Sequence, residues 1–412
     1  MMEHILELQR RLVQCAMPSG FEAPQAQLLM ELARPLADEV YTDTLGNVIC
    51  RKKGPGKKLM LAAHMDVLGL LITDIDSRGF LRFEPLGGHT PFSLIGVSVR
   101  TERGVRGSIW PDKDAGIPGK TPYDVDIHDL FIDLGAKDRA EAEALAPIGS
   151  VCVFDAQPVL LAGGNMMSPY ADDFSGCIAL LQAMEQVKES PNDLYFVFSA
   201  QEEVGCRGGA TAAFGIEPYM GFSVDVTVAA DTPEYLPHQR NRVRLGGGPA
   251  IKLKDGGMRA NPQAVEHLRR SAEAAGIVYQ DEILLGGSTD ARAMQITRSG
   301  VLASCVSIPC RNVHSHGEIV HLEDVRQAGR LLAAAAISAV RISQIPFSKT
   351  IILRSLSARL DGGHLRVFQD LRHDPARIDL HHACLCAQHQ PVGGHIREYG
   401  GHILRHGIIA PV

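Results

Sequence analysis

The 412-residue sequence lacks an excess of positive charge, is poor in aromatic residues and contains no long apolar run. Its formal net charge is -6, whereas a protein that follows nucleic-acid phosphates needs a basic surface, so nucleic acid is not an expected partner. The apolar stretch at residues 331–340 is far shorter than the roughly 20 residues that span a bilayer. Charged residues interrupt the N-terminal segment, which therefore does not match a signal peptide. We expect no membrane association and a cytoplasmic location.

Cysteine is present without a pattern that would indicate disulfides. The nine cysteines are scattered singly, apart from Cys384 and Cys386. An odd, unpatterned set is typical of reduced thiols. Histidines flank the Cys384 pair, but the spacing does not match that of a zinc knuckle. We therefore interpret all nine as ordinary thiols, most of them buried.

The pattern of apolar residues predicts an α/β fold. Helical spacing is present at residues 2–15 and 23–36, and a short apolar run at residues 58–63 ends at His64. From residue 176 onward, helix and strand patterns alternate. The expected helices lie at residues 176–187, 208–214, 262–275 and 322–340, and the expected strands at residues 193–199, 220–226 and 301–308. Such alternation predicts an open α/β sheet, in which ligands bind beyond the carboxyl ends of the strands.

A different sequence pattern interrupts the alternation of helices and strands. Between about residues 71 and 163, short β-branched runs are separated by glycine and proline, which predicts a small β-barrel or sandwich. The catalytic domain is therefore expected in two parts, residues 1–70 and 164–345, on either side of an inserted domain at residues 71–163. The tail, residues 346–412, is rich in histidine and has little periodicity, and we assign it no function.

Five short segments place carboxylates and imidazoles where strands are expected to end. Each alone indicates little, because a His-x-Asp pair is common by chance and two adjacent glutamates usually form a solvated face. Together they offer the nitrogen and oxygen donors that zinc and similar ions accept. Five ligands can be divided evenly between two ions only if one carboxylate bridges them. The candidate ligands are His64, Asp172, Glu203, Asp225 and His314.

These segments resemble the tetrahedral aminopeptidase family, the glutamyl aminopeptidase group whose members have also been described as cellulases. The resemblance extends over about residues 2–345. It implies a three-layer metallopeptidase domain with an inserted PDZ-like β-barrel for dimerisation, and assembly into hollow dodecamers. It also implies that the protein removes N-terminal residues from peptides with two divalent ions, zinc or cobalt, with manganese as a third candidate.

The resemblance assigns different roles to the ligands. Asp172 is implied to bridge the two ions, in a family where its bond to Asp173 is often cis. Glu203 and Asp225 are implied to bind opposite ions, and the two histidines complete the site. The segment departs from the family pattern at Val67, where glutamate is common, and at Phe174, where arginine is common. Position 67 is not a ligand in the family, so the site is retained, whereas Phe174 implies a difference in local packing or substrate preference.

Two further carboxylates are implied to act without binding metal. Asp66 is expected to orient the ring of His64. Glu202 is expected to be the general base that takes a proton from a metal-activated bridging water and later passes it to the leaving amine. Adjacent Glu202 and Glu203 can have separate roles because neighbouring side chains in extended or turn backbone point in different directions.

Two glycine-rich segments, residues 246–251 and 286–291, resemble the family's substrate-pocket loops. Neither has the spacing of a nucleotide-binding loop. The expected substrate-binding residues are Gly286, Gly287, Thr289 and Asp290.

Three functions other than peptide hydrolysis can be compared with these sequence features. A related dinuclear enzyme could remove acyl groups from amino acids, and an oligomeric scaffold could lack activity altogether, although a silent scaffold would not need the complete ligand set. Cellulose hydrolysis is not expected, because a glycosidase needs two free carboxyl groups facing each other across a sugar. The sequence also lacks the Gly-x-Ser-x-Gly elbow of a serine hydrolase.

Overall fold

The computed structural model describes residues 2–112, 125–233 and 243–340. The chain divides into two compact units, Met1–Ser343 and Gln344–Val412. The second unit lies entirely outside the described residues, as do the predicted tail and the Cys384 pair. In the part of the chain that is described, no helix is both long enough and apolar enough to cross a membrane.

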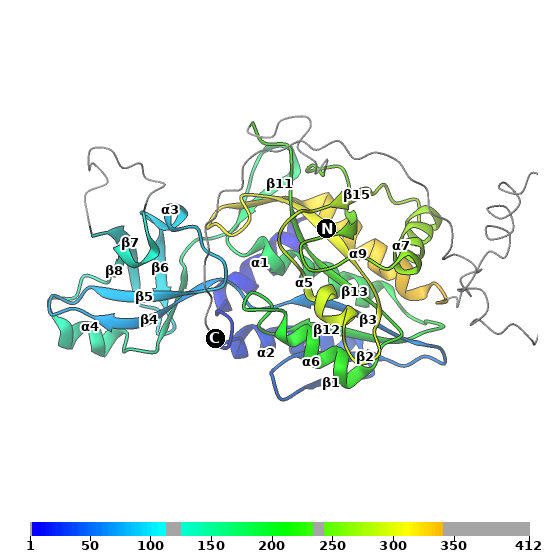
Figure 1. Cartoon of the computed structure of the whole chain (residues 1–412), viewed down its shortest axis with the longest axis horizontal. Coiled ribbons are helices and arrows are strands. Elements are labelled where there is room, and N and C mark those ends of the chain that lie inside the picture. Colours follow the sequence, from blue (N-terminus) through cyan, green and yellow to red (C-terminus); the bar gives the residue numbers. More distant parts are fainter. Residues whose placement is uncertain (1, 113–124, 234–242, 341–412) are drawn as a thin grey trace, which may run out of the picture. The chain divides into compact units, whose positions relative to one another are not determined.

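A mixed sheet forms the centre of the larger unit (Figure 1). Its main path contains, in spatial order, β1 (Glu39–Thr42), β2 (Val48–Lys52), β12 (Asp193–Ser199), β3 (Lys58–His64), β13 (Met220–Val228), β16 (Leu302–Arg311), β17 (Glu318–His321), β11 (Asn165–Ser168) and β10 (Val159–Leu160). Two strands lie off this path: β14 (Ala250–Lys254), which pairs with β16, and β15 (Gln280–Ile283), which pairs with β14.

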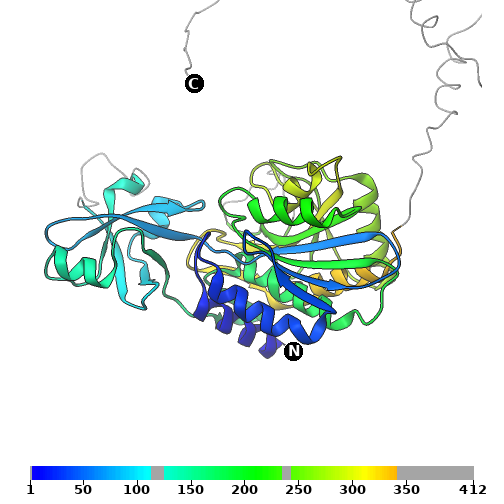
Figure 2. The same cartoon turned by 90° about the horizontal axis from the view of Figure 1, so that it is seen from below.

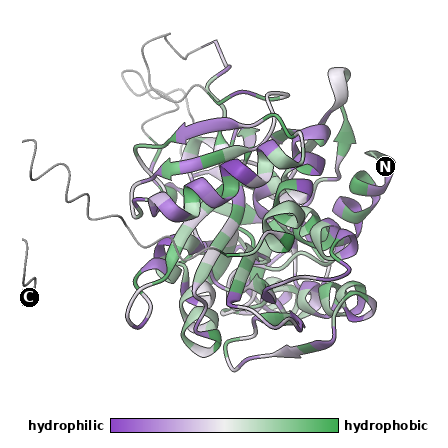
Figure 3. Cartoon of the chain, turned by 90° about the vertical axis from the view of Figure 1, so that its right-hand side faces the viewer, coloured by the Kyte–Doolittle hydropathy of each residue, from purple (hydrophilic) through white to green (hydrophobic). Residues whose placement is uncertain are grey.

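The four central strands β12, β3, β13 and β16 are parallel and almost completely buried. Burial on both faces explains why apolar residues predominate in these strands, and Figure 3 shows mainly white and green strands in the interior, with more purple on the helices in front of them. Ser199 at the end of β12 lies opposite His64 at the end of β3. The carboxyl ends of these strands therefore meet at one edge of the sheet, as the alternating sequence pattern predicts.

Helices cover both faces of the sheet, which confirms the predicted three-layer α/β class. One layer contains α1 (Met2–Cys15), α2 (Ala23–Ala33), α5 (Ala171–Gln186), α7 (Pro262–Ala274) and α9 (Leu322–Ile337). The other contains α6 (Arg207–Ile216) and α8 (Asp290–Gln295), which pack on each other and on the central strands. Figure 2 shows α1 and α2 on one side of the sheet.

The inserted domain is a closed antiparallel barrel, which confirms the expected β-barrel. Its strands, in order around the barrel, are β4 (Gly69–Ile75), β5 (Leu81–Leu86), β8 (Leu130–Asp133), β7 (Arg106–Pro111), β6 (Ser98–Thr101) and β9 (Val151–Phe154). The short helices α3 (Pro91–Leu94) and α4 (Arg139–Leu145) accompany them. The sequence pattern does not reveal β4, in which a register shift interrupts the alternation, or β5, which contains Pro85. Strand β10 falls within the predicted inserted segment but pairs with β11 in the large sheet.

Candidate metal centre

The five predicted ligands come together at the carboxyl edge of the central strands. His64 ends β3, Asp225 lies near the end of β13, and Glu203 follows β12. Asp172 lies in the first turn of α5, and His314 follows β16. We refer to these five residues as the ligand cluster.

Asp172 lies between the two histidines of the ligand cluster. Its Oδ1 is 3.0 Å from Nε2 of His64, and its Oδ2 is 3.6 Å from Nε2 of His314. Nε2 of His314 is also 3.5 Å from Oε2 of Glu203, while Nε2 of His64 is 3.8 Å from Oδ1 of Asp225. The two oxygens of the Asp172 carboxylate therefore face two different groups of potential metal ligands. One group contains His64 and Asp225, and the other contains His314 and Glu203.

The loops that carry the ligand cluster contain unusual backbone conformations. Seven described residues other than glycine have a positive φ, and five of these lie in the site loops: Tyr170, Gln201, Cys206, Asn312 and His314. Such conformations cost of order 1–3 kcal/mol each and concentrate at functional sites. The bond between Asp172 and Asp173 is cis, as the resemblance implies.

The electrostatics of the ligand cluster favour a bound cation. Burial and the charge of Asp172 raise the pKa of Glu203 and of Asp225. Burial also opposes ionisation of Asp172, but the hydrogen bond and charge of His64 outweigh it and lower the pKa of Asp172. Oε1 of Glu203 is buried without a hydrogen-bond partner. Crowded, incompletely paired carboxylates beside imidazoles fit divalent ions that accept mixed nitrogen and oxygen ligands.

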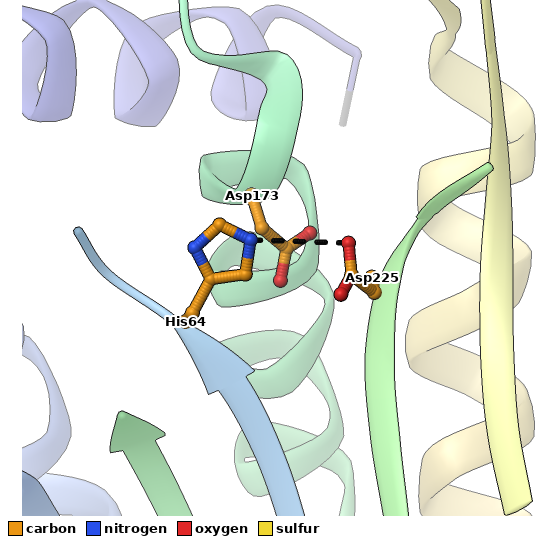
Figure 4. A group of neighbouring side chains, drawn as sticks. All are labelled: His64, Asp173 and Asp225. Atoms are coloured by element: carbon orange, nitrogen blue, oxygen red, sulfur yellow. Dashed lines mark ion pairs between the residues drawn. The ribbon is translucent and has the colours of Figure 1, made fainter. Parts of the chain in front are cut away.

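Asp173 lies close to the ligand cluster, although neither the sequence pattern nor the family resemblance assigns it as a ligand. Together with His64 and Asp225 it forms a group whose ligand atoms lie within 4.8 Å of one another (Figure 4). Its Oδ1 accepts the backbone N–H of Gly176 at 3.0 Å, so the side chain is already engaged at the start of α5. A Cβ atom at Gly176 would lie 2.3 Å from this carboxylate, which explains why glycine occupies that position.

Asp66 holds the loop that carries the adjacent glutamates. Its carboxylate accepts the backbone N–H of Glu202 at 2.9 Å and that of Glu203 at 3.2 Å, and the hydroxyl of Ser19 at 2.6 Å. Nδ1 of His64 lies 3.1 Å from the backbone carbonyl oxygen of Asp66 and 3.6 Å from its carboxylate. The backbone oxygen is therefore the nearer partner of the His64 ring, and the carboxylate mainly fixes the glutamate loop.

Glu202 has the environment of a group that exchanges protons near neutral pH. Burial raises its pKa to about 8, with the charge of Asp290 acting in the same direction. Its Oε1 accepts a hydrogen bond from Sγ of Cys206 at 3.0 Å. A general base works best when its pKa lies near the operating pH.

The four predicted substrate-binding residues differ in their exposure to solvent. Gly286 and Gly287 are exposed in the loop after β15. Thr289 and Asp290 are buried: the hydroxyl of Thr289 lies 3.0 Å from that of Ser223 within β13, and Asp290 accepts the hydroxyl of Ser199 at the end of β12. Only the two glycines are exposed to solvent, and the role of all four in substrate binding stays a prediction.

Gly88 and Glu318 also contact the ligand cluster, although the sequence pattern assigns neither of them a role. The carbonyl oxygen of Gly88, in the loop after the barrel strand β5, lies 2.7 Å from Nδ1 of His314. The carboxylate of Glu318 accepts the backbone N–H groups of Asp172 and His314. A backbone contact such as that of Gly88 leaves no side-chain signal in a sequence. The position of Glu318, four residues after His314, is the only signal it offers.

His89, next to Gly88, provides a test of stability against pH. Its Nε2 lies 3.0 Å from the carbonyl oxygen of Gly69, and burial lowers its pKa to about 4. Because the folded pKa lies below the unfolded value of about 6.5, the unfolded chain binds the additional proton between these values, and stability falls as pH decreases through that window. We expect wild type to lose about 2 kcal/mol more than His89→Gln between about pH 7 and about pH 5. Urea denaturation of both proteins in the presence of chelator measures this difference, and equal losses would contradict a buried neutral His89.

Comparison with known proteins finds similarity to aminopeptidases in both sequence and structure. Residues 46–331 match the family model of M42 glutamyl aminopeptidases. A putative aminopeptidase of Acetivibrio thermocellus is 38% identical over 333 residues, which cover 81% of this chain and 98% of that protein. The solved structure of aminopeptidase APDkam598 from the archaeon Desulfurococcus kamchatkensis has a TM-score of 0.79 and 35% identity, covering 84% of this chain and 99% of that one. PhTET1-12s, solved as a dodecamer, has a TM-score of 0.73 and 28% identity over 82% of this chain and 99% of its own.

Proposed function

Because this chain belongs to the M42 glutamyl aminopeptidase family, a family of metal-dependent peptidases, we propose that its ligand cluster holds two divalent ions and cleaves the N-terminal residue from peptides. The position of Asp172 is the observation that carries this proposal. Its two carboxylate oxygens face different histidines, at 3.0 and 3.6 Å, which is the arrangement required of a bridging ligand. Glu203 and Asp225 lie on opposite sides of this bridge.

Zinc and cobalt are the proposed ions, with manganese as a third candidate, because the donor set combines imidazole nitrogen with carboxylate oxygen. When bound, the two ions supply Lewis-acid chemistry that acidifies a water molecule and polarises the peptide carbonyl. His64 is already oriented for a ligand role, since the Asp66 carbonyl holds its Nδ1 and leaves Nε2 facing the cluster.

Glu202 is proposed to move the proton. Oε1 accepts the Cys206 thiol, so Oε2 is the atom proposed to take a proton from the attacking water and deliver it to the departing amine. A carboxyl with a pKa of about 8 exchanges protons readily in both directions near neutral pH. Asp66 keeps Glu202 and Glu203 on one rigid loop, so the base and the neighbouring ligand remain at a fixed separation.

The proposed activity can be tested by restoring zinc, cobalt or manganese to stripped protein and assaying residue-nitroanilides, acyl-amino acids and cellulose side by side. Release of nitroaniline with the first class alone supports an aminopeptidase. Turnover of acyl-amino acids alone would replace the proposal by a deacylase of the same metal chemistry. If metal-loaded protein turns over none of these substrates, the aminopeptidase proposal fails and the scaffold remains as the alternative.

We also propose a cytoplasmic dodecamer built through the inserted barrel. PhTET1-12s supports the assembly, since it is a dodecamer with which this chain shares its fold. The seven described cysteines are free thiols and most are buried, which fits a reducing compartment. Proposed domain limits are residues 1–70 and 164–345 for catalysis and 71–163 for assembly, with peptides as the substrates.

A further inference from the structure

We propose that Glu318 is a positioning residue that holds the loops of Asp172 and His314 together and thereby sets the geometry of both ion positions. This inference rests on the proposed function, because it takes Asp172 and His314 as ligands. It assigns a role to a residue that binds no ion itself.

The contacts of Glu318 carry the inference. Glu318 is the first residue of β17 and is 2% exposed. Its Oε2 accepts the backbone N–H of Asp172 at 2.9 Å, and its Oε1 accepts the backbone N–H of His314 at 2.8 Å. Each oxygen thus engages a different loop, and the two loops are far apart in the sequence.

The backbone at Asp172 departs from helical geometry within the first turn of α5, with φ of -81° and ψ of 107°, and His314 lies in the loop between β16 and β17. His314 has φ of +65°, and Tyr170, two residues before Asp172, has φ of +60°. Left-handed conformations of this kind persist in residues with a Cβ only when surrounding contacts impose them. Without the Glu318 carboxylate, the N–H groups of Asp172 and His314 would lose their observed partner, and a buried N–H without a partner destabilises the conformation that buries it.

Strand pairing explains how one side chain reaches both loops. Glu318 lies opposite Ser168 in the β11–β17 pair, and the chain continues from Ser168 into the turn that carries Asp172. On the other side, only four residues separate Glu318 from His314, so its carboxylate also closes the loop between β16 and β17. The distance between a proposed bridging ligand and a proposed terminal ligand is therefore fixed by one carboxylate.

Asp324 provides a matched control. It is 1% exposed, and its carboxylate accepts two backbone N–H groups, from Gly246 at 2.7 Å and from Gly248 at 2.9 Å. The hydrogen bonding is thus equivalent to that of Glu318, but the loop that it holds carries no member of the ligand cluster. Loss of either carboxylate is expected to lower stability, whereas only Glu318 is expected to affect metal binding.

The experiment compares Glu318→Gln, Glu318→Asp and Asp324→Asn with wild type. The Gln variant keeps the shape but turns one oxygen into an NH2 donor, so one loop N–H loses its acceptor. We expect its zinc affinity, measured by competition with a chromophoric chelator, to fall by about 10–100-fold, the effect typical of residues that orient metal ligands. Glu318→Asp keeps both acceptors on a shorter stem and should recover part of the affinity. Asp324→Asn should bind zinc within about threefold of wild type, at a lower melting temperature.

Two results would overturn the inference: a folded Glu318→Gln protein with wild-type zinc affinity, or an equal loss of affinity in Asp324→Asn. If Glu318→Gln does not fold, Glu318→Asp carries the test, and unchanged affinity in that variant counts against the proposal. The readout does not depend on turnover. Wild-type protein that binds zinc but cleaves no nitroanilide would refute the aminopeptidase proposal and leave the role of Glu318 to be decided by the affinities.

Discussion

Glu202→Gln is expected to lower kcat on residue-nitroanilides by about a thousandfold, within the range reported for loss of a general base. The amide cannot take a proton from the attacking water, whereas the side-chain shape and the Asp66 contact to the backbone of residue 202 are retained. Metal content should stay near that of wild type, because Glu203 rather than Glu202 belongs to the ligand cluster. Elemental analysis and nitroanilide assays on the same preparation measure both quantities.

Glu22→Gln is the matched control for this prediction. Glu22 is another glutamate buried near the same loop, and its Oε1 accepts the backbone N–H of Gln201 at 3.1 Å. It has no proposed role in proton transfer, so we expect less than about a tenfold change in kcat from the altered hydrogen bond. Equal losses in Glu22→Gln and Glu202→Gln would mean that the loop, and not the base, is being perturbed. Wild-type activity in Glu202→Gln would show that another group takes the proton.

Much of the fold follows from local patterns in the sequence. The buried strands β12, β13 and β16 are recognisable because strands covered on both faces are continuous apolar runs. The carboxyl ends of β3 and β13 could then be predicted as the place where His64 and Asp225 meet. Short strands such as β10 and β17 contain too few residues for a period, so their existence depends on pairing with distant segments.

The residues of the site also differ in how well they can be predicted from the sequence. Donor residues are visible because metal binding demands particular side chains, and the family resemblance adds a role for each. Glu318 is not visible, because its function is to accept two backbone N–H groups and any acidic residue in a sequence has that capacity. Gly88 is less visible still, since only its carbonyl oxygen contacts His314, and a Cβ at that position would lie 3.1 Å from the imidazole.

The negative charge of the buried carboxyl groups in the site is only partly balanced by nearby cationic side chains. Several carboxyl groups are buried within a small volume, and among the described residues Lys252 is a buried cation whose charge acts on Asp225. Lys252 is itself paired with Glu282 at 3.2 Å, so little of its charge is left to compensate the cluster. Buried like charges are expensive unless they are neutralised, which leads us to expect that metal-loaded protein is markedly more stable than stripped protein.

Substitutions of Asp172 and of the adjacent Asp173 distinguish most clearly between a bridging metal ligand and a neighbouring carboxyl group with a structural role. Asp172→Asn should lose most of both ions, because the bridge serves both positions, and turnover should fall by at least about a thousandfold. Asp173→Asn should retain its metal, since Oδ1 of Asp173 is engaged by the backbone N–H of Gly176 and an amide oxygen can accept the same hydrogen bond. Zinc stoichiometry by elemental analysis distinguishes the two variants. The opposite result, with metal retained in Asp172→Asn and lost in Asp173→Asn, would transfer the ligand role to Asp173, whose group with His64 and Asp225 is equally compact.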